Sequence, residues 1–90
     1  MASAIVDPGE LRRFASQLKQ FNNNLRDQLS GLGGQLSALG DSWRDQEHEK
    51  FLREFEETMY VLNHFLEVSE EQLPLLVRKA EKIEEYLQQR

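Results

Sequence analysis

Apolar residues recur at steps of three and four along two long stretches of the chain, and this spacing constrains the fold more than any other feature. Such steps place side chains on one side of an α-helix. In the first stretch the repeating residues are Leu11, Phe14, Leu18, Phe21, Leu25, Leu29, Leu32, Leu36 and Leu39. In the second, which includes the polar Ser69, they are Leu52, Phe55, Met59, Leu62, Leu66, Ser69, Leu73, Leu76, Ala80, Ile83 and Leu87. The pattern predicts two amphipathic helices and no strand.

Local signals set the expected ends of these helices. Asp7 is suited to cap the first helix, and Pro8 fits the first helical position, where its missing N–H costs nothing. Gly40 suits the left-handed position that often follows a helix, and either Ser42 or Asp45 can cap the second helix. We therefore expect a hairpin turn between the two stretches.

The chain is expected to form one domain over residues 1–90, an all-α antiparallel hairpin. The first helix should span about 8–39, the turn 40–45 and the second helix about 46–88. A proline inside a helix removes one backbone hydrogen bond, so either a kink or a short break is expected near Ser69 to Pro74. Because the seam keeps its phase across Pro74, a kink there is favoured.

Three details of the first helix qualify this layout. The glycines between Gly31 and Gly34 allow a competing turn there, but the leucines keep their phase across them. The same glycines either form a small-residue strip that another helix approaches closely or mark a weak, mobile helix end. Two consecutive steps of four, from Phe21 to Leu29, predict a local stutter in the seam, and the run 22–24 of three asparagines is expected on a solvated face.

The apolar surface of the second helix is wider than one helical partner can cover. Phe51, Val61, Phe65 and Val68 lie outside the repeating seam. We therefore expect two hairpins to dimerise into a four-helix bundle. The residues expected in the hairpin core or the dimer interface are Leu11, Phe14, Leu18, Phe21, Leu25, Phe51, Phe55, Leu62 and Phe65.

Composition excludes several classes of function. The formal net charge of −5, with Lys and Arg interleaved among Glu, argues against binding of nucleic acid. With no cysteine, and with His48 and His64 in no recurrent Glu-x-x-His pattern, the chain has no expected metal site and no expected cofactor. Acids and bases of the second helix pair at helical spacing, as on a solvated surface, so no catalytic residues are expected and the protein is not predicted to be an enzyme.

The turn carries the only tryptophan, and here the sequence resembles the WXG family of small type VII secretion proteins. Trp43 in the turn, with Phe51 eight positions later, matches the family's Trp-Xaa-Gly turn followed by an aromatic residue early in the second helix. Asp45 stands where the family has its glycine. The turn motif is thus Gly40, Trp43 and Asp45. Many members also carry an export signal near the C-terminus, a tyrosine followed four residues later by an acid. Here the residue four positions after Tyr86 is Arg90, and the one four positions after Tyr60 is His64, so this signal is not met.

The resemblance implies a function through protein–protein contact. It implies a dimer of hairpins, with the protein itself or with a paralogous hairpin, and recognition of the Trp43 region by a secretion ATPase. No stretch approaches the roughly 20 apolar residues of a membrane span, and the N-terminal residues lack the pattern of a cleaved signal peptide. We therefore expect a protein that is cytoplasmic at synthesis and then secreted. The alternative is an intracellular helical adaptor or secretion chaperone that is not exported.

Overall fold

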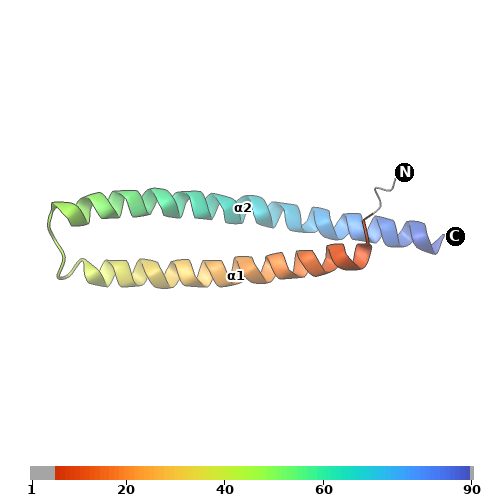
Figure 1. The fold of residues 1–90 in the computed structure, drawn as a ribbon, viewed down its shortest axis with the longest axis horizontal. Coiled ribbons are helices and arrows are strands. Elements are labelled where there is room, and N and C mark those ends of the chain that lie inside the picture. The colour runs from red at the N-terminus through yellow and green to blue at the C-terminus, as the bar shows by residue number, and fades with distance from the viewer. Residues whose placement is uncertain (1–5, 90) are drawn as a thin grey trace.

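The computed structural model describes residues 6–89, which form two antiparallel helices joined by a short turn (Figure 1). Helix α1 spans Pro8–Leu39 and helix α2 spans Gln46–Gln88. The expected all-α hairpin is confirmed. The molecule measures 68 × 22 × 16 Å, and the last turns of α2 extend past the start of α1 (Figure 1).

Asp7 caps helix α1, because its Oδ1 accepts a hydrogen bond of 2.8 Å from the backbone N–H of Gly9. The helix then continues through all of its glycines, so the competing turn between Gly31 and Gly34 is wrong. Leu29 is buried and Leu36 is half-buried on either side of these glycines. Packing of these leucines against α2 outweighs the roughly 1 kcal/mol that each glycine costs in a helix interior.

The turn is built without left-handed backbone. Gly40 has φ −62° and ψ −15°, so the prediction of a left-handed glycine is wrong. The chain instead reverses through a further turn, in which the N–H groups of Ser42 and Trp43 both donate to the carbonyl of Leu39, at 3.1 and 2.9 Å. Asp45, rather than Ser42, caps α2, because its Oδ1 accepts a hydrogen bond of 3.0 Å from the N–H of His48.

The two helices meet along one narrow seam. Its fully buried apolar members are Ala15, Leu29, Leu66 and Ala80. Half-buried leucines fill most of the positions between them, so the core is a single line of layers between two rods.

Asn22 belongs to this seam, which corrects two expectations about α1. Its side chain is 1% exposed and donates a hydrogen bond of 2.8 Å from Nδ2 to Oγ of Ser69. The asparagine run is therefore not wholly on a solvated face. With Ala15 and Asn22 included, the buried positions of α1 alternate steps of four and three as far as Leu29, so the predicted stutter is wrong.

Helix α2 continues without a break through Pro74. Proline leaves the carbonyl of Glu70, four residues earlier, without its helical donor. Because Pro74 is exposed, that carbonyl lies on a side of the helix where water can replace the lost donor.

Candidate interaction surface

The structure separates the predicted interface residues into two groups. Five of them are half-buried and belong to the seam inside the hairpin: Leu11, Leu18, Leu25, Phe55 and Leu62. Four are exposed: Phe14, Phe21, Phe51 and Phe65. The first group holds the hairpin together, and the second is available to another molecule.

Most exposed apolar residues share one position relative to the seam. Each comes one residue before a seam residue, as Phe65 precedes Leu66 and Phe21 precedes Asn22. One residue corresponds to about 100° around a helix, and in an antiparallel pair this rotation brings both rows to the same side of the hairpin. We call this side the apolar face, made of Phe14, Phe21, Val61, Phe65, Val68 and Leu75.

Contacts across the helices show that the apolar face is continuous. The rings of Phe21 and Phe65 meet edge to face, with centroids 6.2 Å apart. Beside them lies a groove of about 520 Å³ that is lined by Phe14, Phe65, Val68 and Leu75, among others. Phe14 and Phe21 are 54% and 53% exposed, and Leu75 is 56% exposed. A contiguous apolar surface of this kind marks a site of protein or membrane contact.

The opposite side of the hairpin carries charges that pair across the helices. Arg12 donates two hydrogen bonds to the Glu84 carboxylate, at 2.9 and 2.8 Å, and Arg26 pairs with Glu70. Each of these four residues comes one position after a seam residue, whereas the residues of the apolar face come one position before. The charged face therefore lies opposite the apolar face. The hydrogen bond from Arg12 holds the pKa of the Glu84 carboxyl below its ordinary value.

Aromatic side chains gather at the turn. The Trp43 ring lies 5.0 Å from the ring of His48 and 5.8 Å from that of Phe51, measured between centroids. Phe51 in turn stacks on Phe55, at 5.8 Å. Trp43 is half-buried and covers the first two turns of α2. We call Trp43, His48, Phe51 and Phe55 the turn cluster; through the exposed Phe51 it reaches the surface.

Comparison with protein-family models matches residues 4–86 to WXG100, described as proteins of 100 residues with WXG. The chain belongs to this family. Comparisons with curated proteins and with solved structures find no match. WXG100 proteins are small helical proteins associated with type VII secretion, and they typically pair in dimers.

The WXG100 turn motif of this chain is Trp43-Arg44-Asp45, with an acid in place of glycine. Asp45 has φ −95° and ψ −174°, an extended conformation that any residue adopts. Glycine is therefore not required by the backbone here. The carboxylate supplies the cap of α2 that glycine lacks.

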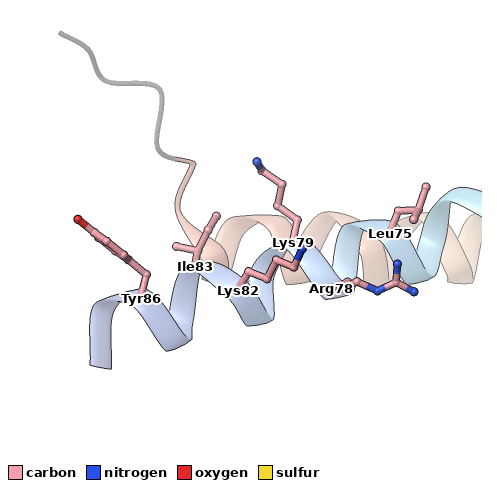
Figure 2. Close-up of a pocket in the computed structure, with 6 residues that line it drawn as sticks. All are labelled: Leu75, Arg78, Lys79, Lys82, Ile83 and Tyr86. Carbon is pink, nitrogen blue, oxygen red and sulfur yellow. The ribbon is translucent and has the colours of Figure 1, made fainter. Parts of the chain in front are cut away.

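The C-terminal end of α2 differs in chemistry from the rest of this WXG100 protein. Leu75, Ile83 and Tyr86, together with Arg78, Lys79 and Lys82, line an open hollow of about 500 Å³ (Figure 2). All six side chains come from α2, and none of the three cations forms an ion pair within residues 6–89. The apolar face therefore ends, at Leu75, beside a hollow lined by three cations.

One residue of the seam, Asn22, and one of the apolar face, Leu75, differ from what the sequence pattern predicts. Asparagine is rarely buried, so the run of asparagines predicts a solvated position for Asn22, although its four-and-three alternation with Leu18 and Leu25 indicates the seam. Leu75 precedes the seam residue Leu76, as Phe65 precedes Leu66, and that regularity could have identified it.

Within residues 6–89 no group of three or more His, Asp or Glu side chains is placed to hold a metal ion. His64 is exposed, and His48 lies against Trp43. Neither helix of the described part is long and apolar enough to cross a membrane.

Proposed function

We propose that this protein packs its apolar face against a second hairpin, its own copy or a paralogue, and forms a four-helix bundle. In that form it serves as a type VII secretion substrate or as the dimer partner of one. The observation that carries the proposal is the apolar face, which joins exposed phenylalanines of both helices into one surface.

The thinness of the hairpin supports the need for a partner. The described part is 16 Å across its shortest dimension, and only four of its apolar residues are fully buried. A chain of 90 residues buries a limited share of its apolar surface when it folds alone. A second hairpin laid on the apolar face would add an inter-hairpin layer of phenylalanine, valine and leucine side chains to the core.

Charge along the rod supports an antiparallel arrangement of the two hairpins. Residues 41–57, at the turn end, contain seven acids and three bases. At the other end, residues 8–19 and 75–88 contain four acids and six bases. Two copies packed antiparallel place the acidic end of each against the more basic end of the other.

The solution mass of matched variants tests the bundle. Phe65→Asp puts a charge on the apolar face, whereas Asn63→Asp adds the same charge at an exposed position outside it. Light scattering after size exclusion should show a monomer for Phe65→Asp and a dimer for both wild type and Asn63→Asp. Wild-type protein that stays monomeric at every concentration and is purified from its own cells without a second hairpin would refute the proposal.

Secretion is supported by membership of the family, and recognition by a secretion ATPase follows from the same resemblance. Export should place the protein in the culture medium, and deletion of the ATPase should retain it inside cells. Appearance in the medium independent of the ATPase would contradict this route.

One observation favours the second candidate function, an intracellular adaptor or secretion chaperone. Tyr60 and Tyr86 are both well exposed, yet the residues four positions later are His64 and Arg90 rather than acids. Arg90 lies outside the described residues. If the protein is such an adaptor or chaperone, it remains inside cells while a bound partner reaches the medium.

A further inference from the structure

Two polar residues lie in the seam where every other described, fully buried residue is apolar. Asn22 is 1% exposed and Ser69 is 4% exposed, and their side chains form the hydrogen bond of 2.8 Å that joins α1 to α2. The Oδ1 atom of Asn22 is also buried, and it has no hydrogen-bond partner. We call these two residues the polar pair.

A buried polar pair of this kind is a poor source of stability. Burying polar groups costs free energy that one hydrogen bond only partly returns, and here an acceptor stays unsatisfied. In helical seams a single buried asparagine is known instead to select one alignment of the helices, because other alignments leave it without a partner. We propose that the polar pair determines the register of α1 against α2.

The pairs of opposite residues on either side of the polar pair, which we call layers, do not by themselves determine the register. Counting four residues from the polar pair in one direction and three in the other places Leu18 opposite Leu73 and Leu25 opposite Leu66. Sliding α2 by one heptad replaces these layers by other apolar layers, because Leu18 then lies opposite Leu66 or Ala80 and Leu25 opposite Met59 or Leu73. Leucine and alanine layers therefore discriminate weakly between registers.

Within the seam, the polar pair is the layer at which the same slide leaves a buried polar group without its partner. The slide brings Asn22 opposite Leu62 or Leu76, and leaves its amide buried with no partner at all. The turn does not prevent the slide, because a turn can exchange residues with the helix ends beside it. The last turns of α1 contain three glycines, and nothing lies within 4 Å of a Cβ added at any of them. Because glycine adopts many backbone conformations, this end of α1 can change from helix to turn at low cost.

Register in turn determines which surface the hairpin presents. A slide of seven residues moves one helix by about 10 Å past the other, at about 1.5 Å per residue. Phe21 then lies near Gln72 or Thr58 instead of Phe65, and the apolar face is interrupted. This consequence for the partner rests on the proposed function, whereas the role of the polar pair in the register does not.

Distances between two spin labels within one chain test the proposal. The protein has no cysteine, so Ser30→Cys and Asn63→Cys, at exposed uncharged positions on the two helices, give one labelled pair. Dilution with unlabelled protein restricts pulsed electron paramagnetic resonance to distances inside one hairpin. The result is therefore independent of whether a second hairpin binds.

Four variants are compared in this labelled background. The double variant Asn22→Leu with Ser69→Ala makes a leucine–alanine layer like that of Leu11 and Ala80, and Asn22→Ala with Ser69→Ala removes both polar groups without adding volume. Ser69→Thr keeps the hydroxyl. Asn23→Leu makes the same exchange of asparagine for leucine at an exposed position, as the matched control.

We expect one distance population in the parent, in Ser69→Thr and in the Asn23→Leu control. Each apolar double variant should add a second population from hairpins displaced by about 10 Å along the axis. The urea midpoint of Asn22→Leu with Ser69→Ala should be equal to or above that of the parent. If both apolar double variants retain the single population of the parent, the polar pair does not select the register.

Discussion

Truncation of Leu66 to alanine should destabilise the protein far more than the same truncation at Leu75, although both leucines lie on α2. Leu66 is 1% exposed, whereas Leu75 is 56% exposed. The change removes about three carbon groups at about 0.8 kcal/mol each, and at Leu66 it also leaves a cavity, for a total of about 3 kcal/mol. At Leu75 less than half of the side chain is buried, so the loss is about 1 kcal/mol.

The comparison cancels helix propensity, because the two variants exchange the same residues in the same helix. Urea unfolding followed by far-ultraviolet circular dichroism gives both free energies of unfolding, provided that the dependence on urea stays constant. At low protein concentration the two losses should differ by about 2 kcal/mol. Equal losses would show that Leu66 does not lie at the centre of the hairpin.

Raising the protein concentration extends the same experiment to the apolar face. If a second hairpin covers Leu75, the loss caused by Leu75→Ala should grow with concentration, because the truncated side chain is then buried in the bundle. The loss caused by Leu66→Ala should change little. A Leu75→Ala loss that is independent of concentration, while the wild type is dimeric, would place Leu75 outside the interface.

Three further changes have outcomes that the structure sets. Asp45→Ala removes the cap of α2 and should cost about 1 kcal/mol, whereas Asp45→Gly, the residue typical of the family, should cost only a few tenths; thermal unfolding ranks the two, and an equal loss would contradict the capping role. Gly34→Ala meets no atom within 4 Å and should raise the free energy of unfolding of the hairpin by about 1 kcal/mol; a loss of stability that appears only in the dimer would instead show that a second helix lies against the glycines. The pKa of Glu84 is lowered on folding, so its contribution to stability is present above its unfolded pKa and is lost as pH falls through the folded value. The difference in urea midpoint between wild type and Glu84→Gln should therefore shrink on acidification from about pH 6 to about pH 3, and a difference that grows would reverse the assigned sign.

Much of the candidate surface could be inferred before the fold was known, because apolar residues beyond the seam of α2 were visible as an excess. Phe51, Val61, Phe65 and Val68 are all exposed in the hairpin, as surplus apolar residues should be. The excess on α1 was harder to recognise. The apolar repeat predicts Phe14 and Phe21 in the seam, where the structure places Ala15 and Asn22 instead.

The difference arises because an apolar pattern indicates only roughly which direction around the helix faces the partner helix. A phenylalanine one residue away from the seam still lies within the broad apolar side that a helical repeat describes. Alanine and asparagine carry too little hydrophobic signal to compete with it. The choice between Phe21 and Asn22 becomes definite only when Ser69 lies opposite and offers the amide a hydrogen bond.

The sequence by itself determined that two long helices form, that a turn separates them and that each has an apolar side, because spacing and capping are local properties of the chain. Tertiary structure alone decided which residues of that side face the other helix. It also brought Phe21 to Phe65 and Arg12 to Glu84, residues far apart in the chain. Those pairings depend on the register of one rod against the other, and register is a relation between helices that no single helix contains.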